Sequence, residues 1–401
     1  MKNETKKTIG LFAVLVFLVG SVYYHAGFSE NKVVKETKVV AAEKKDEKVP
    51  VTILTENKNQ KSVFEEYIPK AKEILKDMTI EEKVGQMFIV RCPEENQLSL
   101  IKDYKPAGFA LFERDFKDKT TQRVIGDIKS YQYTTKIPMI IGVDEEGGEV
   151  TRVSSFKEFR GYPFLSPQEV FKSGGYNAIE MDVAEKSKLL KKLGINVNFA
   201  PVCDVVTNED SFMYKRSFGM DERNTADYVK VIVNAMKEEK MGSVLKHFPG
   251  YGDNQDTHTA IIRDTRAFEQ LEKIDFLPFK SGINEGAACI MVSHNIVECI
   301  DKEYPASLSV DMHKILRNNL GFTGVIMTDA LDMEGVGTLK DEKEIALQAV
   351  KAGNDILIIT DFKTQIPAVI ESVNNGDIPV ELIDNAVTRV LSWKLMLGII
   401  D

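Results

Sequence analysis

Several features that define large protein classes are absent from this sequence. Its 401 residues contain one tryptophan and four cysteines, and no two cysteines form a C-x-x-C pair, so a zinc site built from thiolates is not expected. No G-x-G-x-x-G or P-loop motif opens a helix, which argues against a nucleotide-binding open sheet. The formal net charge is −9 and no basic block occurs, so nucleic acid is not an expected partner.

The cysteines are too few for disulfide bonds to be the main stabilisation of a chain of this length. They are Cys92, Cys203, Cys289 and Cys299. We expect them to be small buried hydrophobic side chains, although an even number permits disulfide bonds. If the chain is exported, Cys289 and Cys299 are the pair to consider.

The N-terminus has the pattern of an export signal. Three lysines within the first seven residues precede an apolar run from Ile9 to Tyr24, which is comparable in length to the shortest membrane spans. No A-x-A cleavage site and no cysteine for a lipid anchor follow, so we expect residues 1–27 to be an uncleaved membrane anchor. The lysines should stay inside, which places the rest of the chain outside the cell. The alternative is a secretory signal cleaved near Ala26.

Residues 28–62 are rich in charged side chains and have almost no aromatic ones, as the stretch from Glu43 to Lys48 illustrates. A segment of this composition cannot bury a core, so we interpret it as a flexible, solvated spacer. Apolar patterning begins near Val63, and residues 63–401 are predicted to form one globular domain.

Within this domain, short apolar runs alternate with amphipathic helical stretches. The runs are nearly continuous in Val, Ile, Met and Phe, as expected for parallel strands buried on both faces. Helical periodicity separates them, for example at Ile179 and Val183. Thr79 and Glu82 form a capping box that predicts the start of a helix. The predicted strands are 86–90, 107–112, 138–144, 195–201, 242–248, 287–293, 323–329 and 354–360.

Eight strands that alternate with helices predict an α/β fold, namely a single (β/α)8 TIM-type barrel, with an open doubly wound sheet as the alternative. The positions of the polar residues favour the barrel, because they follow the C-terminal ends of the strands, and that end of a barrel holds the active site. These residues are Asp144, Asn198, Lys246, His247, His294, Asp329 and Asp361.

Two segments carry residues suited to catalysis. In the glycine-containing segment 246–258, Asp256 and His258 are two positions apart and point the same way if the loop is extended, so Asp256 could orient His258. The alternative is an ordinary polar surface loop. Asp329 ends an almost wholly apolar strand, where a carboxylate is costly unless it is paired. It could be a nucleophile or a metal ligand, or it could cap the next helix.

Other polar side chains near the predicted strand ends have binding chemistry. Asp144 could accept two hydroxyl groups, and Arg216 could supply a forked donor. Of only five histidines, His247, His258 and His294 lie at this end of the predicted barrel, so a three-histidine metal site is conceivable. No H-x-H or H-E-x-x-H spacing is present, and we therefore expect neither a metal nor a cofactor.

Taken in order, the motifs of this chain resemble those of family 3 glycoside hydrolases, specifically the β-N-acetylglucosaminidase branch. The resemblance runs from about Met78 to the end of the chain. Its motifs are Asp77–Met87, Gly142–Gly148, Asn198–Val205, Arg216–Gly219, Lys246–Gly250 and Pro305–Ser309. The resemblance implies a barrel that hydrolyses terminal β-linked N-acetylglucosamine with retention, typically on peptidoglycan fragments.

The resemblance also implies a role for each matching residue. Asp329 matches the nucleophile that forms the glycosyl-enzyme, and His258 matches the loop histidine that serves as general acid/base, with Asp256 as its partner. The residues that match those holding the terminal sugar are Asp144, Arg216, Lys246, His247 and His294. Neither displacement step requires a metal ion or cofactor.

The chain departs from the family pattern at a few positions. Tyr251 replaces the second histidine of Lys-His-Phe-Pro-Gly-His-Gly, Glu149 replaces an arginine, and the loop 246–258 is slightly shorter than in the best-known members. The chain also ends shortly after the predicted barrel. In the family's β-glucosidases a second domain supplies the catalytic acid. Here we expect the acid to come from the barrel itself.

Other functions stay open. One is a β-glucosidase or β-xylosidase of the same family. Another is a sugar-binding, wall-tethering protein on a decayed barrel, which predicts a lost nucleophile or dyad, whereas Asp329, Asp256 and His258 are all present. A third is a glycoside phosphorylase, since a neutral imidazole would not repel an incoming phosphate as a carboxylate would.

Overall fold

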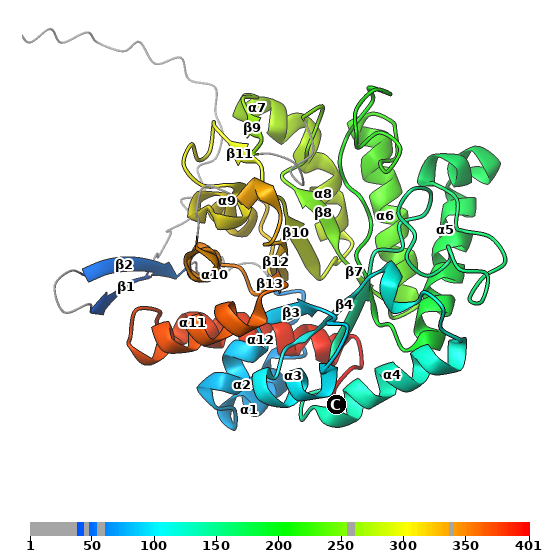
Figure 1. Cartoon of the computed structure of the whole chain (residues 1–401). Helices are drawn as coiled ribbons and strands as arrows, with labels where there is room; N and C mark the ends of the chain where they lie inside the picture. Colours follow the sequence, from blue (N-terminus) through cyan, green and yellow to red (C-terminus); the bar gives the residue numbers. More distant parts are fainter. Residues whose placement is uncertain (1–37, 44–47, 54–60, 255–260, 337–340) are drawn as a thin grey trace, which may run out of the picture. The chain divides into compact units, whose positions relative to one another are not determined.

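The computed structural model describes residues 38–43, 48–53, 61–254, 261–336 and 341–401. Its main element is a parallel sheet of nine strands in the order β7-β6-β5-β4-β3-β13-β12-β10-β8 (Figure 1). The strands are β3 (Phe88–Arg91), β4 (Gly108–Leu111), β5 (Ile140–Val143), β6 (Val197–Asn198), β7 (Gly242–Ser243), β8 (Leu245–Phe248), β10 (Cys289–Val292), β12 (Val325–Ala330) and β13 (Ile356–Ile359).

The two ends of this sheet belong to one stretch of chain. β7 and β8 are separated only by Val244; β7 pairs with β6, and β8 pairs with β10. The stretch 242–248 therefore links both ends, and the sheet is a nearly closed barrel. Counted with β7 and β8 as one interrupted strand, the sheet has the eight positions that the sequence predicts, and each of the eight predicted runs contains or overlaps a strand. The α/β, barrel-like fold is confirmed.

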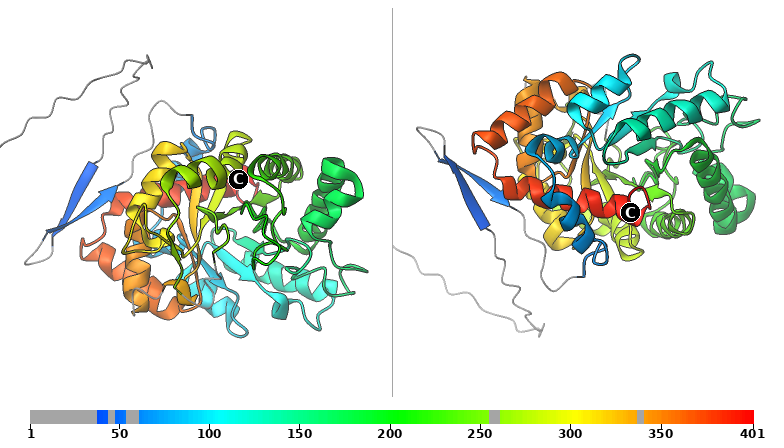
Figure 2. Two further views of the ribbon diagram at one scale, coloured as in Figure 1. Left: turned by 90° about the horizontal axis from the view of Figure 1, so that it is seen from above. Right: turned by 90° about the horizontal axis from the view of Figure 1, so that it is seen from below.

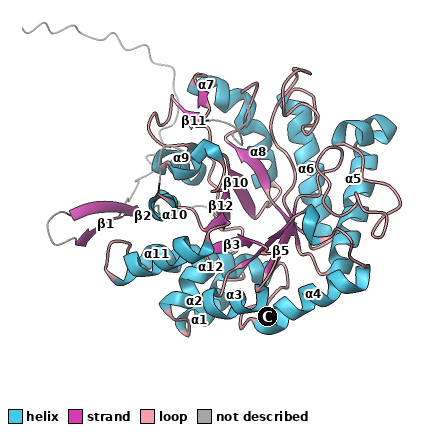
Figure 3. Ribbon diagram, viewed as in Figure 1, coloured by secondary structure: helices cyan, strands magenta, loops and turns pink. Residues whose placement is uncertain are grey.

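Helices surround the strands, as Figures 2 and 3 show. Capping boxes begin two of them, at Thr79 with Glu82, as predicted, and at Ser166 with Glu169. The helices are α1 (Ile68–Lys76), α2 (Ile80–Gly85), α3 (Gln97–Tyr104), α4 (Thr121–Thr134), α5 (Pro167–Leu193), α6 (Glu222–Glu238), α7 (Phe268–Gln270), α8 (Phe276–Asn284), α9 (Val310–Lys314), α10 (Glu342–Ala352), α11 (Phe362–Asn374) and α12 (Val380–Met396).

The strands are buried on both faces because successive residues enter two different apolar clusters. In β3, Phe88 and Val90 pack in the larger cluster, which also contains the helix residues Ile179 and Val183. Ile89, between them, packs in a second cluster made largely of strand residues. One cluster therefore joins the sheet to the helices, and the other fills the barrel. This arrangement explains why the strands are continuous apolar runs rather than alternating ones.

Two further pairs of strands lie outside the barrel sheet. β9 (Arg263–Asp264) and β11 (Ile296–Val297) form a short parallel pair. β1 (Lys38–Glu43) and β2 (Lys48–Ile53) form an antiparallel hairpin within the segment that we predicted to be a spacer. The alternation of Val49, Val51 and Ile53 is the local signal for a strand that the charged composition obscured.

Residues at the predicted boundary near Val63 contact the barrel, and β2 before them contacts α10. The Val63 amide donates to Thr323 Oγ1 at 3.0 Å, and Phe64 is fully buried. Among the described residues, no helix is both long and apolar enough to cross a membrane. The predicted anchor, residues 1–27, lies outside the described residues.

All four cysteines are free thiols in the structure. Cys92, Cys203 and Cys289 are buried, as predicted, whereas Cys299 is exposed. The expectation of burial is therefore wrong for Cys299, which lies in the turn after β11 rather than on a strand. No bond joins Cys289 to Cys299.

Candidate active site

Polar side chains from several strands gather at the C-terminal end of the barrel. Asp144 follows β5, Lys246 and His247 lie in β8, and His294 follows β10. Asp329 is near the end of β12, half-buried. Because the C-terminal ends of parallel strands meet at one mouth, the sequence-predicted residues that the structure describes do come together there.

A chain of alternating charges forms one side of this mouth. The Lys246 ammonium is 2.6 Å from Asp144 Oδ1 and 2.7 Å from Glu146 Oε1. Arg216 forms a bidentate ion pair with the same Glu146: Nη2 donates to Oε1 at 2.7 Å, and Nε donates to Oε2 at 3.1 Å. Lys246 and Glu146 are almost fully buried, while 22% of the Asp144 side chain is exposed. The Arg216 side chain is 18% exposed, so Asp144 and Arg216 are the members of this charged cluster with surface available to a ligand.

The charges of this cluster stabilise one another. Burial by itself would raise the pKa of Glu146, but Lys246 and Arg216 hold it well below its usual range. Burial likewise opposes the charge on Lys246, yet Asp144 and Glu146 raise the pKa of its ammonium. Glu146 and Lys246 are therefore held in their charged forms at neutral pH, and the Lys246 donor needs no proton transfer before a ligand binds.

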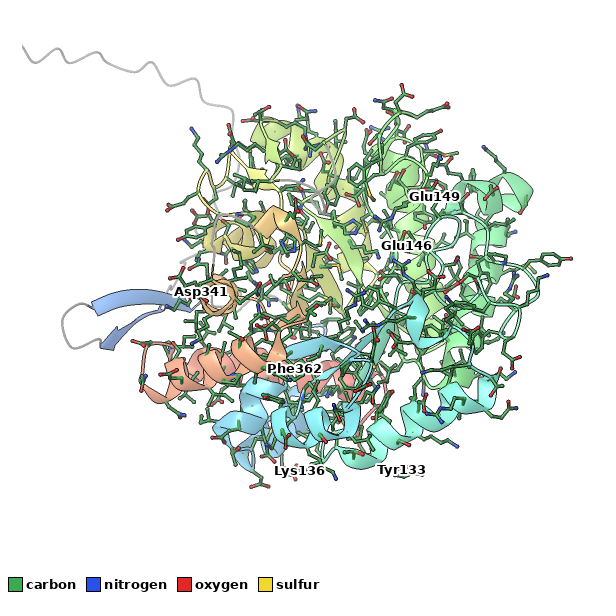
Figure 4. All side chains as sticks on the ribbon, viewed as in Figure 1. Tyr133, Lys136, Glu146, Glu149, Asp341 and Phe362 are labelled. Atoms are coloured by element: carbon green, nitrogen blue, oxygen red, sulfur yellow. The ribbon has the colours of Figure 1, made fainter. Side chains whose placement is uncertain are left out.

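A tight glycine turn places Glu146 in this cluster. Gly147 and Gly148 have positive φ angles of 101° and 64°, and the Glu146 amide donates to Val150 O at 3.0 Å. A side chain at Gly147 would come within 2.2 Å of Leu165 O, so only glycine fits. Figure 4 shows Glu146 and Glu149 on the same side of the barrel.

Buried polar contacts fix the neighbouring backbone. The Glu145 carboxylate accepts the backbone amides of Arg152 at 2.9 Å and Val153 at 2.7 Å. Asn198, at the end of β6, exchanges two hydrogen bonds with the Glu145 backbone. Beneath them, the Lys186 ammonium donates to Glu146 O at 2.9 Å and pairs with Asp182 at 2.6 Å. Asn198 thus fixes the backbone of the loop after β5. Its position at a strand end did not by itself predict this role.

His247 is held by a carboxylate that the sequence did not single out. Asp204 Oδ2 lies 2.8 Å from His247 Nδ1, and Asp204 Oδ1 accepts the Tyr251 amide at 2.7 Å. The Tyr251 ring packs edge-on against the imidazole, with ring centroids 5.2 Å apart. The tyrosine that departs from the family pattern is therefore buried beside His247.

His294 has both ring nitrogens in contact with the protein. Nδ1 is 2.7 Å from Ser307 Oγ, and Nε2 is 2.9 Å from the carbonyl oxygen of Ala330. A carbonyl only accepts, so Nε2 carries the hydrogen, and Nδ1 accepts from the serine in the neutral ring. The geometry favours His294 as a support for the backbone next to Asp329.

Asp329 and Asp144 lie on opposite sides of the barrel. Going from β5 through β4, β3 and β13 to β12 takes four steps along the sheet, and going through β6, the interrupted strand and β10 also takes four. A ligand between the two carboxylates would therefore span the mouth. Asp329 Oδ1 accepts the Ala330 amide at 2.8 Å, which fixes the orientation of the side chain.

The sequence from residue 79 to 393 matches the model of the glycosyl hydrolase family 3 N-terminal domain. This chain belongs to glycoside hydrolase family 3. A β-hexosaminidase from Methylobacillus flagellatus is 32% identical over 265 residues, which are 63% of this chain and 72% of that protein. The β-hexosaminidase LpqI from Mycobacterium tuberculosis is 29% identical over 272 residues, 64% of this chain and 68% of that protein.

A solved structure gives the same family. The family 3 β-N-acetylglucosaminidase from a Paenibacillus species superposes with a TM-score of 0.74 at 27% identity. The match covers 80% of this chain and 63% of that one, so this chain spans less than two thirds of the solved protein's length. Membership of family 3 makes the chain a glycoside hydrolase.

Two predicted residues of this family 3 site, Asp256 and His258, lie in 255–260, outside the described residues. On either side of that stretch the chain is anchored by Arg266, which donates to Gly250 O at 2.9 Å and pairs with Asp264 and Asp275. Burial raises the pKa of Asp275 to about 7, although the Arg266 charge opposes the shift.

Sequence reasoning overlooked Glu146, Asp204 and Arg266. The first two lie inside motifs that we quoted for the family 3 resemblance, in 142–148 and 198–205, so their place in an ordered motif was the available signal. Glu149, which replaces an arginine of the family pattern, pairs with Lys215 at 3.1 Å at the exposed rim. Within the described part of the chain, no three His, Cys, Asp or Glu side chains are close enough to hold a metal ion.

Proposed function

We propose that this chain is a retaining, exo-acting β-N-acetylglucosaminidase that removes terminal β-linked N-acetylglucosamine on a single (β/α)8 barrel. One observation carries the proposal: Asp329 and the charged cluster of Asp144 and Lys246 lie on opposite sides of the same barrel mouth, so a sugar bound in the mouth lies between a nucleophile and a set of hydroxyl-binding groups. The β-hexosaminidase and β-N-acetylglucosaminidase relatives support the choice of sugar.

The reaction is a double displacement. Asp329 attacks the anomeric carbon and forms a glycosyl-enzyme, while His258 gives its proton to the departing oxygen. Water then attacks the same carbon, with His258 as the base, and the configuration is retained. Asp256 orients His258 and stabilises its charged form.

The sugar is held at the end that lies away from Asp329. With the anomeric carbon at Asp329, the opposite edge of the ring meets Asp144, whose exposed oxygen accepts hydroxyl hydrogens, and the donors Arg216 and Lys246. His247 adds a further contact from β8. His294 acts through the backbone at Ala330.

The choice of sugar is tested with a panel of aryl β-glycosides. Residues 63–401 should release product from the N-acetylglucosaminide at least about tenfold faster, as kcat/KM, than from the glucoside or xyloside. A preference for the glucoside or xyloside would instead assign the chain to the corresponding activity of the same family. No turnover of any of the three would support the sugar-binding alternative.

Replacing His258 with alanine should impair natural substrates far more than activated aryl glycosides, because a good leaving group departs without a proton. General acid/base help is worth about 10²–10⁴-fold, and that loss is expected on a chitooligosaccharide. A nitrophenyl glycoside should lose much less in the glycosylation step, and Asp256→Ala should show a weaker version of the same pattern. Equal losses on both substrates would exclude His258 as the acid.

The proposed natural substrate is a peptidoglycan fragment outside the cytoplasmic membrane, with residues 1–27 as the anchor and 28–62 as the connection to the enzyme. This location follows from the lysine-flanked apolar run at the N-terminus. Fractionation of cells that produce the full-length protein tests it: activity should sediment with membranes and be accessible to added protease.

Deleting residues 1–62 should leave a soluble enzyme with unchanged kcat/KM, because it keeps Phe64, which is fully buried in the cluster that fills the barrel. The hairpin β1–β2 is removed by this deletion, so a second truncation that starts at Lys38 is the matched control. Activity of the longer form alone would move the domain boundary into the hairpin.

A further inference from the structure

Asp204 is a buried carboxylate, and the pairing of its backbone segment with β8 places it beside His247. It follows β6 on a stretch that runs beside β8: Val202 forms a parallel bridge with Lys246, and the Lys246 amide donates to Pro201 O at 3.2 Å. Asp204 is 1% exposed, and 6% of the His247 side chain is exposed. The two groups therefore meet in a setting where neither can exchange its partner for water.

Every contact that the structure gives to the Asp204 carboxylate comes from a donor. Oδ2 accepts the His247 backbone amide at 3.2 Å and faces His247 Nδ1 at 2.8 Å, and Oδ1 accepts the Tyr251 amide at 2.7 Å. A carboxylate can only accept, so Nδ1 must carry a hydrogen. In the neutral imidazole, Nε2 then has a free lone pair.

We propose that Asp204 is a positioning residue for substrate binding: it fixes the tautomer and the ring orientation of His247, so that Nε2 accepts a hydrogen bond from a sugar hydroxyl. The inference rests on the proposed function, because it places His247 in the sugar pocket. The Tyr251 ring, at an angle of 70° to the imidazole, blocks rotation on the other side. Asp204 also accepts the Tyr251 amide, so one carboxylate positions both the imidazole and the tyrosine that packs against it.

An amide cannot replace this carboxylate. If the side-chain oxygen of the Asp204→Asn variant faced His247, its NH₂ group would face the Tyr251 amide, and two donors would oppose each other. If the amide were turned round, its NH₂ group would face His247 Nδ1, which would then have to become an acceptor. The hydrogen would move to Nε2, and His247 would offer the sugar a donor in place of an acceptor.

The first test is the tautomer of His247 in the full-length, unliganded protein. Imidazole nitrogen NMR on protein labelled at its five histidines, with His247→Ala to assign the signal, reads the protonated nitrogen directly. The expected result is hydrogen on Nδ1, above the pH at which the ring is doubly protonated. Hydrogen on Nε2 in the wild-type protein overturns the proposal. This measurement involves no turnover, so it stands even if the proposed activity fails.

The second test is the kinetics of Asp204→Asn on the aryl N-acetylglucosaminide. We expect KM to rise about 10- to 100-fold while kcat stays within about threefold, because a binding contact made equally in ground and transition states is lost. Damage to the fold would lower kcat through the active fraction and leave KM unchanged, and that pattern contradicts the proposal.

A double-mutant cycle and a matched control complete the design. In the His247→Ala background, Asp204→Asn should have little further effect on KM, because its partner is gone; an equal effect in both backgrounds overturns the proposal. Asp355→Asn removes another fully buried carboxyl, one that precedes β13 and bonds Arg317 and Arg389 rather than His247. Its KM should equal the wild-type value, and a similar rise would show that the effect is not specific to Asp204.

Discussion

Asp329→Asn should abolish turnover while leaving the fold intact. The amide keeps the oxygen that accepts the Ala330 amide at 2.8 Å, so the local backbone should not change. What is lost is the negative charge that attacks the anomeric carbon, and removal of a catalytic nucleophile costs at least about 10³-fold in kcat. The measurement is kcat on the aryl N-acetylglucosaminide, with the thermal midpoint as the check on folding.

Asp332→Asn is the matched control for this prediction. Asp332 lies three residues further along the same segment, is exposed, and accepts the Thr360 hydroxyl at 2.8 Å. Its exchange changes the charge of the mouth by the same amount without touching the proposed nucleophile, so kcat should change little. If Asp329→Asn kept more than a few per cent of wild-type turnover, another carboxylate would have to be the nucleophile.

The strands of the barrel were predictable because a strand that is buried on both faces consists mainly of apolar residues, which the sequence shows directly. Each predicted run contained or overlapped such a strand. The hairpin β1–β2 was missed because the lysines and glutamates around it dominate the composition. The break at Val244, which divides one run into β7 and β8, arises from pairing with different neighbours and has no local signal.

The polar end of the barrel was predictable, but the pairing within it was not. Strand ends identified Asp144 and Lys246, which are 102 residues apart in sequence and 2.6 Å apart in space. That Glu146, and not only Asp144, would meet Lys246 depends on the glycine turn after β5. The same limit applies to His294, whose ring turns toward Ala330, because a strand-end position does not fix the direction of a side chain.

Lys394 is a second case that the sequence conceals, since it lies within the amphipathic helix α12 and yet is fully buried. Its ammonium donates to Gln86 Oε1 at 2.6 Å, and Gln86 in turn donates to Lys105 O. Burial lowers the pKa of Lys394 from its ordinary value of 10.5 to about 7. Contrast Lys186, which is also buried but pairs with the carboxylate of Asp182.

The pH dependence that follows has a definite sign. Between about pH 7 and 10.5 the unfolded chain binds the Lys394 proton and the folded protein does not, so the free energy of unfolding rises with pH in this window. The total change is about 5 kcal/mol, because each pKa unit corresponds to about 1.4 kcal/mol. Below about pH 7 both states are protonated, and the destabilisation is present in full.

Lys394→Met should therefore change the sign of its effect with pH. At pH 6 the variant avoids the buried charge, which contributes about 5 kcal/mol, and leaves the Gln86 oxygen without a donor, which costs about 2 kcal/mol, so it should be more stable than the wild type by about 3 kcal/mol. At pH 10 little of the charge penalty remains and the lost hydrogen bond dominates, so the variant should be less stable by about 1 kcal/mol.

Urea unfolding from pH 6 to pH 10 measures the difference in the free energy of unfolding between the two proteins, in which the contributions of groups common to both cancel. Lys186→Met is the comparison: it leaves the partly buried Asp182 without its cation and should destabilise the protein across the whole range, with no change of sign. A constant difference between the wild type and Lys394→Met would mean that Lys394 keeps its proton in the folded protein.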